Sequence, residues 1–364
     1  MPAKPTRQHV LNCALPSWYP RFKHVSLRTE ILPLTSDFVE YLLADGVFLS
    51  KDSSIGKVDP RDLNSYSDDD DDDDDDGASA LAGTARSLAQ PNRVAASGFD
   101  SNDSSDDDWE QQSQSETDSI APTAPNFPEL EAAIKAAIAK LGPVFPKLNW
   151  SAPQDASWII PGGTIKCVSA DEVFLLLKSS DFIVHDLCHS FDECSDLHDE
   201  PDSVPMFLAL RRWHDLLRSM EFRCFVRNRQ LIAISQRDVS NFYDFLPGMR
   251  ATIRLQIAEF FAEHVRENFP NNDYVFDMYV NPSREIIKLV DFNPYHAPTS
   301  TALFDWEELE GLSGETVEVR VVDSPMNVQP SEYGAYKVPA DVLSVQTTED
   351  IERFAALFQS GQLA

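Results

Sequence analysis

Two aspartates and an asparagine in the C-terminal third of the chain have the spacing of a divalent-cation site. Asp277 and Asp291 lie on either side of a polar turn, Asn-Pro-Ser-Arg at residues 281–284, and apolar residues flank the turn on both sides. This pattern predicts a β-hairpin. If the turn centres near Arg284, Asp277 faces Asp291, and Asn293 points to the same face as Asp291 because strand side chains alternate.

Facing carboxylates destabilise a sheet unless a positive charge compensates them. A hard cation with oxygen ligands would do so, and three protein oxygens leave room for water and phosphate, the usual setting of Mg²⁺ beside a nucleotide. The alternative interpretation is that Asp and Asn form turns at strand ends, where both are common.

Basic residues elsewhere provide candidate phosphate contacts. Lys147 ends a predicted strand and precedes a loop of small residues at 151–155. It could hold a phosphate as a point charge while the backbone amides of Ser151 and Ala152 approach it. The alternative is an edge-strand lysine with a buried aliphatic stem.

Two further strand segments carry charged or aromatic side chains. Residues 210–213, Leu-Arg-Arg-Trp, could present backbone groups and an indole to an adenine ring, or form a core strand with exposed arginines. Arg223 and the pair Arg237-Asp238 could face a triphosphate and metal. Alternatively they form cross-strand ion pairs, which contribute little by themselves.

These residues need a scaffold of short helices and hairpins. Periodicity predicts helices at 36–43 (capped by Ser36), 129–141 (ending at Gly142), 171–177 (started by Ser169) and 254–268, the last with Ile253, Ile257, Phe260, Phe261 and Val265 inward. It predicts strands at 144–150 and 207–213, with Pro146 indicating an edge strand or a strand start, and a hairpin of 221–226 and 231–236. Phe222, Cys224 and Val226 should share one face of that hairpin, with Glu221, Arg223 and Phe225 on the other. Helices mixed with hairpins favour the α+β class.

Other signatures are weak or missing. The segment from His185 to His198 is rich in His and Cys, but its spacings match no common closed zinc site, so a mobile polar loop is expected there. The patterns GxSxG, GxxxxGK[ST] and GxGxxG do not occur, so a nucleotide would need a scaffold other than a P-loop or Rossmann fold.

Charge is concentrated in one region. The 364-residue chain has a formal net charge of −30, and residues 51–126 carry 20 acidic and 5 basic residues, with an unbroken aspartate run at 68–76. Such a segment buries too little apolar surface to fold, which predicts a disordered acidic linker. The acidity argues against direct nucleic-acid binding over the whole surface and favours a monomer.

The five cysteines form no CxxC pair, and the sequence shows neither a signal peptide nor a membrane-length apolar run. These features predict a cytoplasmic protein with reduced thiols and no membrane contact.

Several longer words are similar to the cell division cycle protein 123 family. They include FPKLNWSAPQDASWI, LLLKSSDFI, EFRCFV, ISQRD and VDFNPY, together with HVLNC, SWYP, ILPL and YLLADG near the N-terminus. The resemblance covers most of residues 8–311 outside the acidic segment.

The resemblance implies an ATP-grasp-like fold in which two α+β subdomains clamp ATP and Mg²⁺. It implies an ATP-binding chaperone that binds the gamma subunit of eukaryotic translation initiation factor 2 and promotes its assembly, without a need to cleave ATP. The implied organisation is a partner-binding N-terminal segment that packs on the core (1–50), a linker (51–126), two subdomains (127–215 and 216–311) and a C-terminal segment with its tail (312–364).

Site residues follow from the same resemblance. The implied phosphate loop holds Lys147, Asn149 and Ala152, with Asp155 counted among the cofactor-binding residues. The adenine and ribose end is lined by Arg211, Arg212 and Trp213, and the cleft by Glu221, Arg223 and Asp238. The implied magnesium ligands are Asp277, Asp291 and Asn293.

Two other functions remain open. An ATP-grasp carboxylate-amine ligase or phosphotransferase would use ATP as phosphoryl donor, and it would need an acceptor pocket and groups that stabilise the transferred phosphoryl. An acidic mimic of RNA or histone would act through the aspartate run and would not need residues 127–311.

Overall fold

A computed structural model describes residues 2–44, 126–160, 162–196, 204–281, 283 and 285–330. All of these belong to one compact unit of the chain. The predicted acidic linker, up to residue 125, and the tail from residue 331 lie outside the described residues. Within the described ranges each helix is too short or too polar to span a bilayer, and all five cysteines are free thiols.

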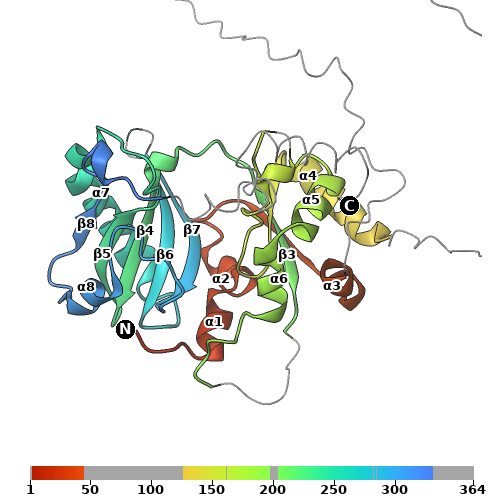
Figure 1. Cartoon of the computed structure of the whole chain (residues 1–364), viewed down its shortest axis with the longest axis horizontal. Helices are drawn as coiled ribbons and strands as arrows, with labels where there is room; N and C mark the ends of the chain where they lie inside the picture. Colours follow the sequence, from red (N-terminus) through yellow and green to blue (C-terminus); the bar gives the residue numbers. More distant parts are fainter. Residues whose placement is uncertain are drawn as a thin grey trace, which may run out of the picture. The chain divides into compact units, whose positions relative to one another are not determined.

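Helices alternate with short strands, so the predicted α+β class is confirmed (Figure 1). The helices are α1 (Arg7–Cys13), α2 (Leu15–Phe22), α3 (Ser36–Leu43), α4 (Pro128–Leu141), α5 (Ala170–Lys178), α6 (Asp181–Cys188), α7 (Leu246–Phe260) and α8 (Trp306–Gly311). The strands are β1 (Thr29–Pro33), β2 (Val144–Lys147), β3 (Phe207–Arg212), β4 (Glu221–Arg227), β5 (Gln230–Gln236), β6 (Tyr274–Asn281), β7 (Ile286–Pro294) and β8 (Glu318–Arg320).

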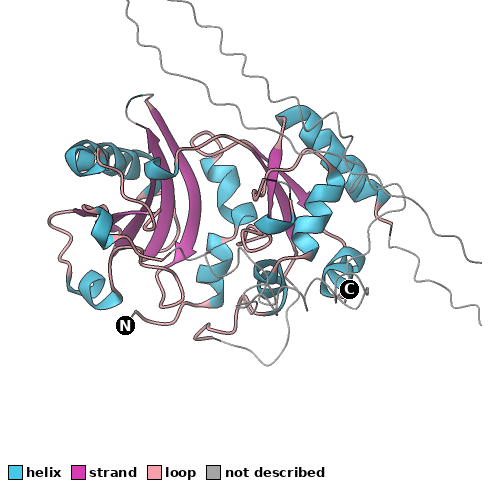
Figure 2. Cartoon of the chain, turned by 45° about the horizontal axis from the view of Figure 1, so that its top comes forward, coloured by secondary structure: helices cyan, strands magenta, loops and turns pink. Residues whose placement is uncertain are grey.

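The strands form two separate sheets (Figure 2). The smaller sheet has the order β1-β3-β2 and is antiparallel, with Thr29 opposite Arg211 and Val144 opposite Arg212. Pro146 lies on β2, at the edge, where its missing N–H costs no ladder hydrogen bond. The edge position predicted for this proline is therefore correct.

The larger sheet has the order β7-β6-β4-β5-β8, with β8 parallel to β5 and the other pairs antiparallel. The β6–β7 hairpin pairs Asp277 with Asp291, so the register predicted from the turn is confirmed. The next pair joins Met278 to Leu289, which leaves Val290 as the extra residue of a β-bulge.

Because side chains alternate along a strand, the two faces of the larger sheet contact different hydrophobic cores. Phe222, Cys224 and Val226 of β4 point into the large core against α7, while Phe225 points into a second core beside α8, as predicted. The residues predicted to face inward on the long helix are all buried, although α7 begins at Leu246 with a proline in its first turn and passes into a π-helical turn at Phe261–Val265.

Helices α3 and α5 begin at side-chain caps. The α5 cap is the predicted Ser169, which forms a reciprocal capping box with Glu172. The α3 helix has the predicted range, but its cap is Thr35 rather than Ser36, because the Thr35 side chain accepts the hydrogen bond from the Phe38 amide. Helix α4 ends before Gly142 as predicted.

The mobile loop predicted from His185 onward is wrong for its first residues, which belong to α6. Ser180 caps this helix by accepting a hydrogen bond from the Ile183 amide. A serine directly before the helix is the sequence signal that could have predicted α6. His198 lies outside the described residues, and among those described, groups of three or more His, Cys, Asp or Glu able to hold a metal ion are absent.

Candidate functional site

Sheet register alone brings charged side chains together on one face of the larger sheet. Arg223 of β4 lies opposite Asp277 of β6, which in turn lies opposite Asp291 of β7. The residues next to them in sequence, such as Phe276 and Phe292, point into the apolar core on the other face. The three strands therefore place a cation and two carboxylates in one polar row.

Asp277 is neutralised by two arginines. Arg223 donates from Nε to Oδ1 at 2.8 Å and from Nη2 to Oδ2 at 2.9 Å, a bidentate pair, and Arg237 Nη1 lies 3.3 Å from Oδ2. Arg223 is fixed further by a 2.9 Å hydrogen bond from Nη1 to the Ser300 carbonyl. Burial would raise the pKa of Asp277, but the two arginines outweigh it and hold that pKa below its usual value.

The cross-strand ion pair considered as the alternative for Arg223 is thus present. Arg223 and Asp277 are both about 95% buried, so this pair is unlike the weak exposed pairs of a protein surface. The predicted role of Asp277 as a magnesium ligand stays a prediction.

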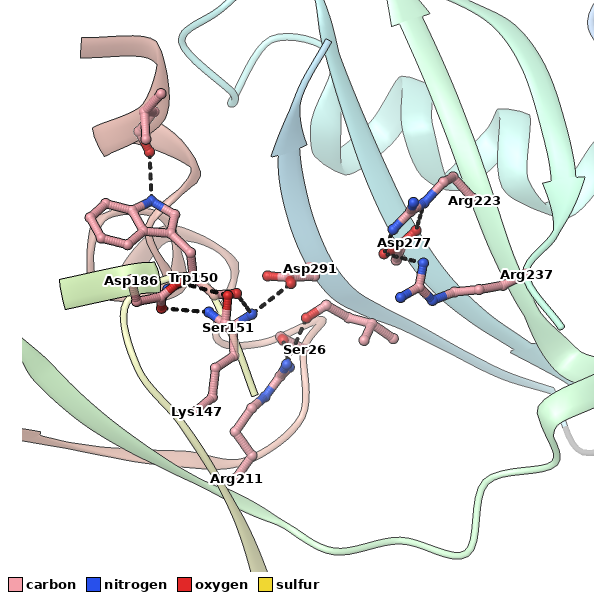
Figure 3. Close-up of polar contacts among 12 residues, drawn as sticks. Ser26, Lys147, Trp150, Ser151, Asp186, Arg211, Arg223, Arg237, Asp277 and Asp291 are labelled. Atoms are coloured by element: carbon pink, nitrogen blue, oxygen red, sulfur yellow. Dashed lines mark hydrogen bonds and ion pairs between the residues drawn. The ribbon is translucent and has the colours of Figure 1, made fainter. Parts of the chain in front are cut away.

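Asp291 has a different cation as its partner. Lys147 Nζ, from the smaller sheet, lies 2.7 Å from Asp291 Oδ2 and also donates to the Trp150 carbonyl. Lys147 is a buried ammonium at the edge of its sheet, and this ion pair joins the two sheets. Figure 3 shows the carboxylates of Asp277 and Asp291 turned towards different cations.

One oxygen of Asp291 is left over. Oδ1 is buried and has no hydrogen-bond partner among the described residues, and a buried unpaired carboxylate oxygen is costly. Asn293 lies two residues further along β7, on the same face as Asp291. Carboxylate and amide oxygens are the donors that a hard divalent cation takes, so these two residue types fit such an ion.

Arg211 lies beneath the hairpin rather than at the surface. It is almost completely buried, with Nη1 donating to the Val290 carbonyl at 2.8 Å and Nη2 to Ser26 Oγ at 3.4 Å. Burial lowers the pKa of this guanidinium, and the charge of Asp291 partly offsets the effect. The alternative interpretation, a core strand with exposed arginines, is therefore wrong for Arg211.

The next two residues, Arg212 at the end of β3 and Trp213 directly after it, are less buried than Arg211. Arg212 is half-buried, and its backbone amide donates to the Arg28 carbonyl at 2.8 Å. The Trp213 indole donates to Asp215 at 2.9 Å and meets Phe145 edge-on. The indole is therefore partly exposed and held in place.

The loop after Lys147 is organised by a residue that the sequence analysis missed, Asp186 of α6. The backbone amides of Trp150 and Ser151 donate to Asp186 Oδ2 at 3.0 and 2.7 Å, and Ser151 Oγ donates to Oδ1 at 2.6 Å. Burial raises the pKa of Asp186, while its hydrogen bonds and Lys147 act to lower it. The expected approach of the Ser151 amide to a phosphate does not hold here, because this carboxylate already binds it.

Asn149 and Asp155 are buried, and their polar atoms are engaged within the smaller half of the molecule. Asn149 Nδ2 donates to the Pro205 carbonyl at 3.1 Å, and its Oδ1 accepts from the Phe207 amide at 3.0 Å. Asp155 accepts from Ser180 Oγ at 2.6 Å and from the Asp181 amide at 2.7 Å, at the start of α6.

Ala152 is half-buried and packs against the core of the smaller sheet. The cofactor roles predicted for Asn149, Ala152 and Asp155 therefore stay predictions, and hydrogen bonding explains the burial of the first and third residues without a ligand.

Glu221 and Asp238 lie at the Arg237 end of the polar row. Burial raises the pKa of Glu221, and Arg237 acts in the opposite direction. Burial would also raise the pKa of Asp238, but hydrogen bonds from Tyr243, Ser240 and Asn241 bring it below its usual value.

The structure thus gathers Lys147, Arg211, Arg223, Asp277 and Asp291 from both sheets. Buried lysine and arginine groups next to carboxylates can bind an anionic ligand together with its cation. A search by local spacing could not have found Asp186, because it lies 35 residues from the loop that it holds.

Comparisons with a family model, with related sequences and with solved structures all indicate the same family. A family model described as D123 matches residues 18–346. The chain is 36% identical over 360 residues to a translation initiation factor eIF2 assembly protein of Xenopus tropicalis, with 95% of this chain and 94% of that protein covered. For the protein of the same name from Xenopus laevis the identity is 37% over 362 residues, with the same coverage of 95% and 94%.

A solved structure of Cdc123 from Schizosaccharomyces pombe superposes with a TM-score of 0.64 and 29% identity, covering 89% of this chain and all of that one. The family resemblance inferred from the sequence words is confirmed. With a family model that matches most of its length and relatives that align almost from end to end, the chain belongs to the D123 family.

Proposed function

We propose that this chain is an assembly factor for eukaryotic translation initiation factor 2. The observation that carries the proposal is the alignment with proteins of that name over 95% of this chain and 94% of theirs, which leaves no large region of those relatives unmatched. More finely, we propose that the gamma subunit is the contacted partner and that assembly takes place in the cytoplasm.

We further propose that the chain binds ATP with Mg²⁺ at the Lys147–Asp291 pair, in an ATP-grasp-like clamp formed by the two sheets. The carrying observation is the unpaired, buried Oδ1 of Asp291, while the other oxygen of Asp291 binds a buried lysine. Mg²⁺, when bound, would neutralise charge on the phosphates.

The residues of the chain have separate roles in this proposal. Lys147 binds a phosphate as a point charge, and Asp291 and Asn293 hold Mg²⁺ with Asp277 close by. Arg211 and Arg223 supply buried positive charge, and the partly exposed Trp213 with Arg212 forms the adenine end.

The ATP proposal is tested by calorimetric titration with ATP, with and without Mg²⁺, on the wild-type chain and on Asp291→Asn. The expected loss in the variant exceeds about 10-fold in Kd, or about 1.4 kcal/mol, because the amide keeps an acceptor for Lys147 but removes the charge next to the cation. Asp192→Asn, at an exposed aspartate, is the matched control. Unchanged affinity in Asp291→Asn would contradict the site.

The partner proposal is tested by binding of the purified chain to separately purified alpha and gamma subunits, with ATP and Mg²⁺ present. Binding to gamma and not to alpha is expected, and the reverse order contradicts the finer proposal. ADP release in the same samples tests the ligase or phosphotransferase alternative, which predicts turnover that rises when an acceptor is added.

A further inference from the structure

The N-terminal residues 7–28 contact both sides of the proposed ATP site. On one side the Val25 carbonyl accepts a 2.9 Å hydrogen bond from the Leu289 amide, and Ser26 Oγ donates to the Leu289 carbonyl at 2.8 Å. Leu289 lies two residues before Asp291, next to the bulge at Val290. The N-terminal segment therefore fixes the edge of β7 beside the carboxylate.

On the other side the same segment holds the loop after Lys147. The Leu15 amide donates to the Asn149 carbonyl at 2.7 Å, and the Trp150 indole N–H donates to the Val10 carbonyl at 2.8 Å. Helix α1 and its junction with α2 thus bind the loop at consecutive residues.

Trp150 connects three elements through its polar groups. Its indole N–H binds α1, its backbone amide binds Asp186 of α6, and its carbonyl accepts from Lys147 Nζ. The ring lies edge-on to Phe191 at 5.6 Å between centroids, and the Arg7 guanidinium covers Phe191 at 4.3 Å. A displacement of Trp150 must therefore move the hydrogen bond that orients Lys147.

We infer that Trp150 is the positioning residue through which α1 sets the place of Lys147, so that ATP binding and the ordering of α1 are thermodynamically coupled. The inference rests on the proposed ATP site. Coupling is reciprocal in free energy: a phosphate bound by Lys147 stabilises α1, and a protein partner that contacts α1 changes the affinity for ATP.

Trp18 provides a matched control for a variant of Trp150. Trp18 belongs to the N-terminal segment, residues 7–28, and is buried in the large core. Its indole N–H has no hydrogen-bond partner among the described residues. Trp150→Phe and Trp18→Phe remove the same atoms, and only the first removes a hydrogen bond to α1.

The test combines calorimetric titration with ATP and Mg²⁺ and amide hydrogen exchange of residues 7–13, with and without saturating ATP and Mg²⁺. In the wild type, nucleotide should slow the exchange of α1. Trp150→Phe should weaken ATP binding about 5-fold, as expected for the loss of one hydrogen bond, and should abolish the slowing even when ATP is saturating. Trp18→Phe should keep both the affinity and the slowing.

Wild-type ATP affinity in Trp150→Phe together with nucleotide-dependent slowing overturns the inference and leaves the ATP site intact. A wild-type chain that binds no ATP overturns the ATP site itself. If Trp150→Phe does not fold, the wild-type exchange decides: slowing of α1 by nucleotide supports the coupling, and unchanged exchange overturns it.

Discussion

Asp277 and Asp291 face each other across one hairpin, yet their surroundings differ completely. Both oxygens of Asp277 accept hydrogen bonds from Arg223, which lies on the neighbouring strand of the same sheet. Arg237 forms an ion pair with one of these oxygens. Asp291 is paired through one oxygen to Lys147 of the other sheet and keeps its second oxygen unpaired. A shared register therefore does not give shared partners: arginines pair with Asp277, whereas Asp291 keeps one oxygen unpaired, and the proposed ligand site is centred on Asp291 for that reason.

The sharpest test of this contrast is Asp277→Asn. The amide cannot compensate Arg223, which remains buried with an unpaired charge, so the free energy of unfolding should fall by about 3 kcal/mol. Urea unfolding followed by circular dichroism measures the loss. A loss below about 1 kcal/mol would remove the structural role assigned to Asp277.

The complementary change is Asp291→Asn, whose main effect should be on ligand binding. Its affinity for ATP with Mg²⁺ should fall by more than about 10-fold, equivalent to about 1.4 kcal/mol. Its unfolding free energy should change by less, because Asp291 is more exposed than Asp277, and Lys147 keeps its hydrogen bond to the Trp150 carbonyl and the nearby charge of Asp186. The comparison fails if Asp291→Asn is the less stable of the two variants.

Arg223→Lys tests whether geometry or charge secures Asp277. Lysine keeps the positive charge but cannot reproduce the bidentate fork or the added bond to the Ser300 carbonyl. We expect a loss of about 1 kcal/mol in unfolding free energy. Stability equal to wild type would mean that charge alone suffices, and Arg237→Lys, at the longer contact, is the control.

The smallest effect concerns pH. The pKa of Asp277 is lowered in the folded chain, so its contribution to stability is fully present above the unfolded value near 3.9 and is lost as pH falls through the folded pKa. The stability gap between wild type and Asp277→Asn should be constant from about pH 8 to 5 and should narrow below about pH 4. Urea titrations at several pH values measure this difference in unfolding free energy. If the difference already narrows between pH 7 and 5, a titrating group other than Asp277 causes it.

The local parts of this site were predictable from the sequence. The symmetric spacing of apolar residues around the turn gave the pairing of Asp277 with Asp291, and alternation gave the faces of β4. The faces of β4 follow from the two-residue period of a strand, and the pairing follows from the position of the turn, so both depend only on nearby positions. The bulge at Val290, which shifts the pairs between this position and the turn, was not predicted.

The partners of these residues were not predictable, because they depend on packing between distant elements. Lys147 meets Asp291 across 144 positions, and Asp186 reaches back to a loop 35 positions earlier. Asn149 and Asp155 illustrate the same point: hydrogen bonds to residues far along the chain account for their burial, and spacing within the loop could not reveal these partners.

The central position of β3 in the smaller sheet has a consequence for synthesis of the chain. Both edge strands, β1 and β2, pair with β3, and Thr29 meets Arg211 about 180 residues later. At a translation rate of roughly 5–20 residues per second, β1 leaves the ribosome on the order of 10 s or more before the strand that completes it. During that interval β1 has no β3 to pair with, so a chaperone that binds the nascent chain would meet β1 as an unpaired strand.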